Sequence, residues 1–188
     1  MSTHLHIQEQ WQRRSIATKR LIVRTFRPED GDDLYAYLSR PEVYRFEPGE
    51  PLSHQQAQER TLEFSSSLDF WAVVLQAEQR VIGQVYFSQV EPLYLRAWEL
   101  GYILNPAYQR QGYASEAVAA LVQHGFAAAG IHRITAYCNP DNMASWKLLE
   151  KTGFRREGLL KKNVFFRKDE HGVPLWTDTY IYARLAED

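Results

Sequence analysis

The sequence predicts a single α/β domain built around a mixed sheet. Short runs rich in β-branched residues alternate with longer segments whose apolar residues recur every three or four positions, as in amphipathic helices. The predicted order is β, α, α, β, β, β, α, β, α, β, β. The 188 residues, of which 45% are hydrophobic, can form one substantial core, and no linker or repeat divides them. We expect a domain at 16–188 after a polar leader at 1–15.

The first third of the chain is predicted to form one strand and two helices. The run LIVRTF at 21–26 is rich in β-branched residues and predicts a strand. Pro28 and the acidic residues after it are typical of a helix N-terminus. The stretch 39–52 contains three prolines and a glycine, which predicts an irregular loop. A serine begins the next helix, 53–65, whose expected inward positions are Ala57, Thr61, Leu62 and Phe64.

The rest of the chain repeats strands and helices in alternation. Strands 70–76 and 81–87 are joined by a short polar turn, which predicts a hairpin. Further strands are expected at 98–104, 133–138, 154–157 and 180–185. Helices are expected from Ala114 to the glycine at 130 and from Asn142 to Lys151, because each carries apolar residues at helical spacing and is followed by a glycine.

The segment 106–114, PAYQRQGYA, joins a strand to the long helix that follows. Pro106 stops the strand because it has no N–H to donate. Gly112 permits a close approach of the backbone to a ligand, and Ala114 adds almost no side chain. The turn therefore presents backbone N–H groups at the positive end of a helix dipole, which favours phosphate-type anions. Neither a P-loop nor a Gly-x-Gly-x-x-Gly fingerprint is present.

Three motifs together resemble the Gcn5-related N-acetyltransferase (GNAT) superfamily, and within it the RimJ/RimL branch. Alone, the motif that begins at Asn142 could be an ordinary helix with an asparagine cap and a terminal glycine, but all three motifs occur in order and at the spacing of the family. The motifs are the Gln/Arg-x-x-Gly-x-Gly/Ala loop filled by Gln109, Gly112 and Ala114, the Asn142-x-x-Ser145 helix ending in LEKTGF at 149–154, and WELGY at 98–102. The resemblance spans the chain and implies a mostly antiparallel sheet flanked by helices, with two splayed parallel central strands.

The resemblance implies that acetyl-CoA binds between these splayed strands, which end at Leu104 and Cys138. The pantetheine arm would pair with backbone near Tyr102 and Leu104, and the pyrophosphate would lie on the N–H groups of 110–115. The residues implied in coenzyme binding are Tyr102, Leu104, Gln109, Arg110, Gln111, Gly112, Tyr113, Ala114, Ser115, Asn139 and Asn142.

The resemblance also implies direct attack of an amine on the thioester, without an acyl-enzyme. Glu99 is the predicted base, acting directly or through water, although a surface carboxylate on the outer sheet face is the alternative. Many family members place a tyrosine acid on the last helix, where this chain has Leu149. Ser145 is therefore predicted to hydrogen-bond the departing sulfur, whereas Tyr108 and Tyr113 are expected to be structural.

The acceptor is predicted to contact the loop at 39–52 and the connection at 158–178. Tyr44, Phe46 and Glu47 in the loop form an aromatic and acidic set that suits an amine cation, although a solvated loop can have the same composition. The resemblance favours the α-amino group of a ribosomal protein. A small amine or aminoglycoside is the alternative, and a non-catalytic acyl-CoA-binding regulator is another. The protein is expected to be a monomer or a homodimer.

Composition disfavours several other classes of function. The 22 Lys and Arg residues are balanced by 23 Asp and Glu, which gives no general attraction to nucleic acid or anionic membranes. No apolar run approaches the roughly 20 residues of a membrane helix, and no signal peptide is recognisable. The single cysteine, Cys138, suits a reducing cytosol and is expected to be a buried small hydrophobe. His4 and His6 are too few to predict a metal site.

Overall fold

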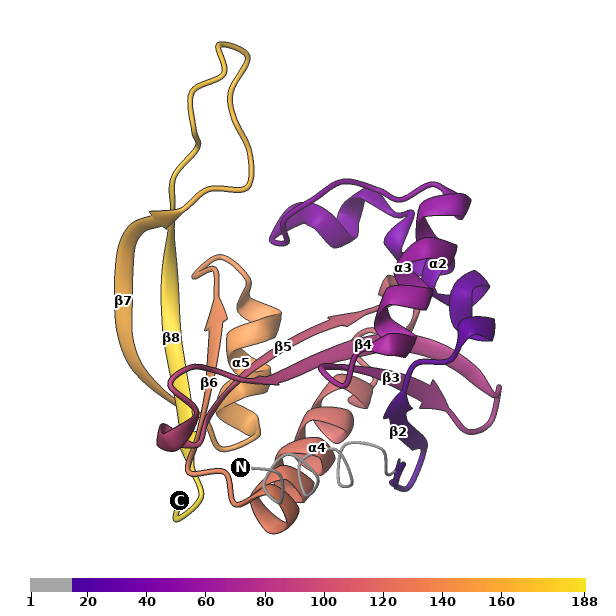
Figure 1. The fold of residues 1–188 in the computed structure, drawn as a ribbon. Coiled ribbons are helices and arrows are strands. Elements are labelled where there is room, and N and C mark those ends of the chain that lie inside the picture. The colour runs from indigo at the N-terminus through magenta and orange to yellow at the C-terminus, as the bar shows by residue number, and fades with distance from the viewer. Residues whose placement is uncertain (1–14) are drawn as a thin grey trace.

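The computed structural model describes residues 15–188, so positions 1–14 of the predicted leader, with its two histidines, lie outside the described residues. Eight strands form one sheet in the order β1-β2-β3-β4-β5-β6-β8-β7 (Figure 1). The strands are β1 Ile16–Ala17, β2 Leu21–Thr25, β3 Phe70–Leu75, β4 Arg80–Gln89, β5 Ala97–Leu104, β6 Arg133–Cys138, β7 Arg155–Val164 and β8 Thr177–Leu185. The helices are α2 Gly31–Leu38, α3 His54–Ser66, α4 Tyr113–Ala129 and α5 Met143–Lys151, with the 3-10 turns η1 Pro28–Asp30, η2 Pro41–Arg45, η3 Leu93–Leu95 and η4 Pro106–Tyr108.

The strands β5 and β6 are the one parallel pair in this sheet, and every other neighbouring pair is antiparallel. Their pairing runs from Ala97 opposite Arg133 to Leu100 opposite Ala136 and then stops. Both strands continue, to Leu104 and Cys138, but they diverge (Figure 1). The predicted mixed sheet with two splayed parallel strands is therefore confirmed.

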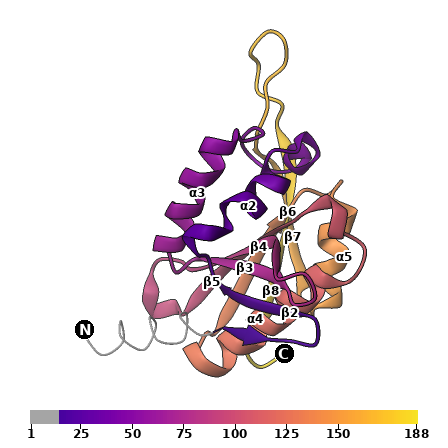
Figure 2. The same ribbon diagram turned by 90° about the vertical axis from the view of Figure 1, so that its right-hand side faces the viewer.

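Helices cover both faces of the sheet, and each face has its own core (Figure 2). The larger core lies under α4 and α5 and includes Trp71, Phe87 and Trp98. The smaller core lies under α2 and α3, where Leu34 and Phe64 are buried. Each fully buried side chain of this size contributes roughly 1.5–3 kcal/mol, so these two layers fix the orientation of β5.

Local sequence explains most of the helix boundaries. Ser53 caps α3 and forms a capping box with Gln56. Gly130 adopts the left-handed conformation, with φ of 60°, that ends α4. Asn142 caps α5 by accepting a hydrogen bond from the amide of Ser145. By contrast, Gly112 is the N-cap residue of α4 and provides no side-chain hydrogen bond.

Some element predictions need correction. Leu62 was expected to face inward but is 53% exposed, because Ala57, Thr61 and Phe64 form the buried stripe of α3. The strand predicted at 154–157 extends to Val164, and its side chains are almost all exposed, so no apolar alternation marks it. The loop at 39–52 contains η2. None of the helices in residues 15–188 has the length and apolarity needed to span a bilayer.

Candidate active site

The segment after β5 turns sharply and opens into the N-terminus of α4. Asn105 stabilises η4 by accepting a hydrogen bond from the amide of Ala107 at 3.0 Å. Arg110 and Gly112 then take left-handed conformations, with φ of 60° and 83°. Glu116 donates its amide to the carbonyl of Gly112 at 3.1 Å, which is the first backbone hydrogen bond of α4. Residues 111 and 112 are exposed in this turn, and 113–115, in the first turn of α4, are half-buried.

The backbone amides of this turn are open. Those of Tyr113, Ala114 and Ser115 precede the first helical hydrogen bond and have no intrahelical acceptor. The amides of residues 110–112 also have no hydrogen-bond acceptor among residues 15–188. The 17-residue helix adds its positive end at the same point, so the turn favours an anion. This geometry fits the pyrophosphate position predicted for the turn.

Side chains of the turn stabilise it through hydrogen bonds to neighbouring backbone carbonyls. Gln109 donates its side-chain amide to the carbonyl of Leu104 at 3.2 Å, which ties the turn to β5. Gln111 makes a longer bond, 3.4 Å, to the carbonyl of Ala107. The hydroxyl of Tyr108 donates to Glu78 at 2.6 Å. Arg110 stays exposed at the rim.

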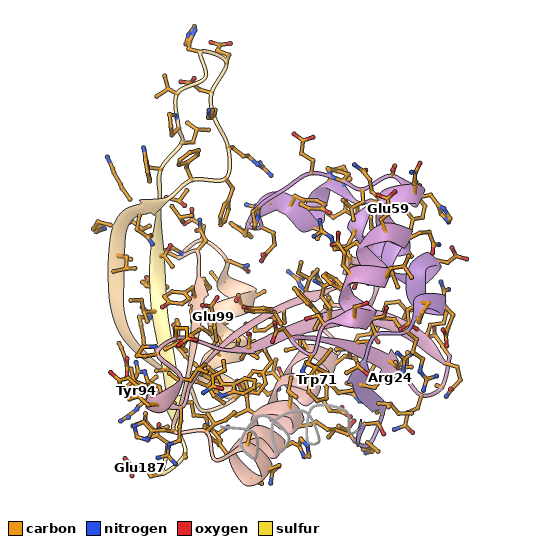
Figure 3. The ribbon with its side chains drawn as sticks, viewed as in Figure 1. Arg24, Glu59, Trp71, Tyr94, Glu99 and Glu187 are labelled. Atoms are coloured by element: carbon orange, nitrogen blue, oxygen red, sulfur yellow. The ribbon has the colours of Figure 1, made fainter. Side chains whose placement is uncertain are left out.

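Alternation along β5 assigns the predicted site residues to opposite faces of the sheet. Tyr102 and Leu104 pack against the larger core, on the side of α4 and α5. Glu99 faces the other side, and its side chain is half-buried (Figure 3). Burial raises the pKa of the Glu99 carboxyl above its ordinary value. The pairing of β5 with β6 stops at Leu100, just past Glu99, so the gap between the two strands connects the two faces of the sheet there.

Tyr102 on β5 and Ser145 on α5 are joined by hydrogen bonds. The Tyr102 hydroxyl donates to the Ser145 carbonyl at 3.1 Å and lies 2.9 Å from the Ser145 hydroxyl. If its single proton is used on the carbonyl, the Ser145 hydroxyl donates to Tyr102. Burial raises the pKa of the Tyr102 phenol well above its usual range. Alternation could have predicted this pairing, because it directs Tyr102 toward α5.

Cys138 lies at the end of β6 beside Ser145. It is buried, as predicted, with 7% exposure. Burial raises the pKa of its thiol to about 11, against a smaller lowering from the Ser145 hydrogen bond. The thiol is therefore neutral at pH 7, and its environment is that of a core residue rather than a nucleophile.

The two asparagines before α5 serve as turn and cap. Asn139 accepts a hydrogen bond from the amide of Asp141 at 2.8 Å, and Asn142 accepts one from Ser145 at 3.2 Å. The capping interpretation is confirmed, and it uses only the side-chain oxygens. The NH₂ groups of both side chains have no hydrogen-bond acceptor within residues 15–188, which leaves that of Asn142 available for the predicted pantetheine contact.

The loop at 39–52 meets the long arm that residues 165–176 form between β7 and β8 (Figure 1). Arg167 of the arm donates to the carbonyl of Tyr44 at 2.7 Å. The Tyr44 ring is buried and its hydroxyl donates to the Leu38 carbonyl at 2.9 Å. Tyr44 therefore supports the loop, and its contact with an acceptor stays a prediction. Phe46 remains half-buried, with the Arg45 guanidinium 5.0 Å from its ring centre.

Glu47 is a half-buried carboxylate without a hydrogen bond or ion pair to any residue in 15–188. Burial raises its pKa from 4.5 to about 7. Its charge also raises the pKa of Tyr102, so Glu47 lies within electrostatic reach of the splayed strands. No group of three or more His, Cys, Asp or Glu residues in the described part of the chain is arranged to hold a metal ion.

The raised pKa of Glu47 predicts a pH-dependent stability. Because the folded pKa exceeds the unfolded one, the stabilising contribution is complete below about pH 4.5 and is lost as the pH rises through about 7. Between pH 5 and pH 8 we expect the wild type to lose ~1–2 kcal/mol of unfolding free energy relative to Glu47→Gln. This value is reduced from the full pKa shift because the carboxyl keeps some contact with solvent. Urea unfolding at both pH values measures this. Glu50→Gln, in the same loop but exposed, is the control, and an equal difference there would contradict the burial argument.

The sequence did not predict that residues far away along the chain stabilise the turn at 110–112. Arg20, between β1 and β2, bonds to the Gln111 carbonyl and to Glu116. Arg167 likewise reaches Tyr44 across 123 positions. No local pattern signals such distant contacts. Only the arginines themselves were visible in the sequence.

Comparison with known proteins agrees with this geometry. The sequence model described as an acetyltransferase (GNAT) domain matches residues 20–155. The chain is 33% identical over 174 residues to the uncharacterized N-acetyltransferase YnaD of Bacillus subtilis (strain 168), covering 92% of this chain and 98% of that protein. It is 29% identical over 157 residues to the [ribosomal protein uS5]-alanine N-acetyltransferase of Escherichia coli (strain K12), covering 78% and 80%.

A solved structure extends the likeness to three dimensions. The crystal structure of the GNAT-family acetyltransferase from Bacillus anthracis has a TM-score of 0.84 to this chain at 31% identity, covering 93% of this chain and all of that one. The residues matched by the family's sequence model, 20–155, include the strand, turn and helix around the open amides. The chain belongs to the GNAT family of N-acetyltransferases, which use acyl-CoA, and RimJ/RimL-type ribosomal-protein acetyltransferases are among its relatives.

Proposed function

We propose that this GNAT N-acetyltransferase transfers the acetyl group of acetyl-CoA to the α-amine of a protein N-terminus by direct attack. The observation that carries the proposal is the uncapped N-terminus of α4, which follows the end of β5, the strand that diverges from β6 beyond Leu100. An anion held there would direct a thioester chain along β5, past Tyr102 and toward Glu99. The reducing cytosol, which suits the lone Cys138, is the compartment we propose.

The turn fits the coenzyme in chemical terms. Gly112 has no Cβ to obstruct a phosphate, and the amides of 110–115 supply neutral donors at a helix N-terminus. The Asn142 NH₂ group can donate to a pantetheine carbonyl. Acetyl-CoA supplies the thioester, and these residues bind and orient it.

The pKa of the acceptor amine argues for an N-terminus over a lysine. At pH 7 a lysine with a pKa of about 10.4 costs roughly 4.6 kcal/mol to deprotonate, whereas an α-amine with a pKa of about 8 costs only about 1.4 kcal/mol. A single carboxylate base such as Glu99 can serve the second more easily than the first. The relative that acts on ribosomal protein uS5, by its name, modifies an alanine, and an alanine N-terminus is the acceptor to test first.

We propose that the Ser145 hydroxyl donates a hydrogen bond to the departing sulfur, and that the Tyr102 hydroxyl holds Ser145 in place through its hydrogen bond to the Ser145 carbonyl. The sulfur leaves as a thiolate, and a hydroxyl that donates to it lowers the barrier. We expect Ser145→Ala to lower kcat about 10–100-fold, the worth of one charge-assisted hydrogen bond, and Tyr102→Phe to lower it about fivefold. Steady-state rates at saturating acetyl-CoA measure both. Ser65→Ala on α3 is the control, since its hydroxyl bonds only to the Leu62 carbonyl. Unchanged kcat in both variants would remove these hydroxyls from the step.

A thiol-release assay with acetyl-CoA tests the proposal. The acceptors are a peptide with a free alanine N-terminus, the same peptide with a blocked N-terminus and a lysine, a polyamine, free amino acids and an aminoglycoside. Turnover confined to the free N-terminus supports the proposal, whereas turnover confined to the small amines replaces the acceptor. Coenzyme binding without any turnover identifies a non-catalytic regulator. No thermal stabilisation by millimolar acetyl-CoA refutes the coenzyme site itself.

A further inference from the structure

Arg20 contacts the coenzyme turn from a distant part of the chain. It lies between β1 and β2, yet its Nη1 donates to the Gln111 carbonyl at 2.9 Å. Its guanidinium carbon lies 4.3 Å from the centre of the Tyr113 ring. These two contacts fall on either side of Gly112, whose φ of 83° belongs to the left-handed region. Arg20 therefore holds the turn whose backbone amides are open.

The other side of the Arg20 guanidinium holds Glu116. The Arg20 Nε donates to one carboxylate oxygen of Glu116 at 2.7 Å, and the Arg20 backbone amide donates to the other at 2.9 Å. Thr18 adds a hydroxyl donor at 2.6 Å. Burial alone would raise the pKa of Glu116, but the hydrogen bonds from Thr18 and Arg20 lower it below its ordinary value. Glu116 is therefore ionised, one helical turn from the proposed phosphate position, and Arg20 neutralises it.

One nitrogen of Arg20 remains unused. Its Nη2 has no hydrogen-bond acceptor among residues 15–188. It lies 3.4 Å from the position that a Cβ on Gly112 would occupy, which is next to the open amides. The side chain is 39% exposed, so a ligand on the turn can reach it. The planar guanidinium fork can hold a carboxylate and a carbonyl while a further N–H donates to a phosphate oxygen.

We propose that Arg20 is the positioning residue of the coenzyme phosphate site. It fixes the Gly112 turn, cancels the charge of Glu116 and donates through Nη2 to a phosphate of the coenzyme. This inference rests on the proposed binding of acetyl-CoA at the turn. It makes Arg20 specific for the phosphate part of the donor and indifferent to the thioester.

The test compares two acetyl donors. For Arg20→Gln we expect the KM for acetyl-CoA to rise about 10–100-fold, as for loss of a charge-assisted hydrogen bond, with kcat nearly unchanged. Acetyl-pantetheine carries the same thioester but lacks the diphosphate and the nucleotide, so its KM should not change. A merely structural role would raise both KM values by the same factor, and that result overturns the proposal. Arg155→Gln, which removes an exposed arginine paired with Asp188, is the matched control.

Further variants keep the test decisive. The double variant Arg20→Gln/Glu116→Gln should bind acetyl-CoA more tightly than Arg20→Gln, because the uncompensated carboxylate is gone. If Arg20→Gln does not fold, Arg20→Lys replaces it, and we expect a smaller KM rise that is again confined to acetyl-CoA. Wild-type thermal stabilisation by acetyl-CoA separates the two ideas. If acetyl-CoA does not stabilise the wild type, the coenzyme site itself is refuted. If it does stabilise the wild type but Arg20→Gln has an unchanged KM, only the role of Arg20 is refuted.

Discussion

Gly112→Glu is expected to abolish acetyl-CoA binding, with a Kd at least about 100-fold higher than that of the wild type, or roughly 2.7 kcal/mol. The residue has a φ of 83°, where a side chain costs about 1–2 kcal/mol, and the new Cβ would lie 3.4 Å from the Arg20 Nη2 atom. The added carboxylate would also stand where the phosphates bind and repel them. Titration calorimetry with acetyl-CoA measures the loss.

Gly130 provides a matched control for this variant. It ends the same helix and also has a left-handed backbone with φ of 60°, and apart from its own chain neighbours no atom of residues 15–188 lies within 4 Å of an added Cβ. Gly130→Glu therefore carries the same strain and charge change at the opposite end of α4. It should be destabilised at least as much, because the negative end of the helix disfavours a carboxylate, yet bind acetyl-CoA normally. Equal binding by Gly112→Glu and Gly130→Glu would contradict the assignment of the turn.

Glu99→Gln is expected to lower turnover by about 10²–10⁴-fold while the affinity for acetyl-CoA stays near normal. Glu99 faces the side of β5 away from α4 and α5, is half-buried, and has a pKa raised by burial. If it accepts the proton of the amine, directly or through water, kcat/KM in the wild type rises with pH as Glu99 ionises. That limb of the pH profile should disappear in Glu99→Gln. Rates across several pH values, with the acetyl-CoA Kd measured alongside, test this.

Glu47→Gln is the comparison variant for the base. Both carboxylates have pKa values raised by burial, but Glu47 lies on the loop and Glu99 on the strand beside the predicted thioester. We expect Glu47→Gln to change the KM of the amine more than kcat. Loss of kcat and of the pH limb in Glu47→Gln, with normal rates in Glu99→Gln, would reverse the assignment.

The sequence predicted most of the fold because local signals and periodicity agreed with it. Ser53, Gly130 and Asn142 each mark a helix end by a known capping mechanism, and all three do so in the structure. The parallel pairing of β5 and β6 followed from the family resemblance. The full length of β7 could not be predicted, because an edge strand exposed on both faces shows no alternation.

The candidate site was predictable where the backbone makes it and less so where side chains meet. Gly112 and the open amides follow from a six-residue pattern and its position after a strand. The burial of Tyr44 was missed because its partner is the Leu38 carbonyl, and backbone acceptors leave no mark in the sequence. The contact of Arg20 with Glu116 was missed because 96 positions separate them and either residue suits a surface.

The divergence of β5 and β6 also bears on how the protein should be handled. Beyond Leu100 and Ala136, β5 and β6 no longer pair with each other. The sheet therefore has two short unpaired strand edges in its middle, in addition to its two edge strands. Unpaired strand edges recruit extended polypeptide from other molecules. Concentrated stocks without coenzyme are therefore expected to self-associate more readily than stocks kept with it, and light scattering would register the difference.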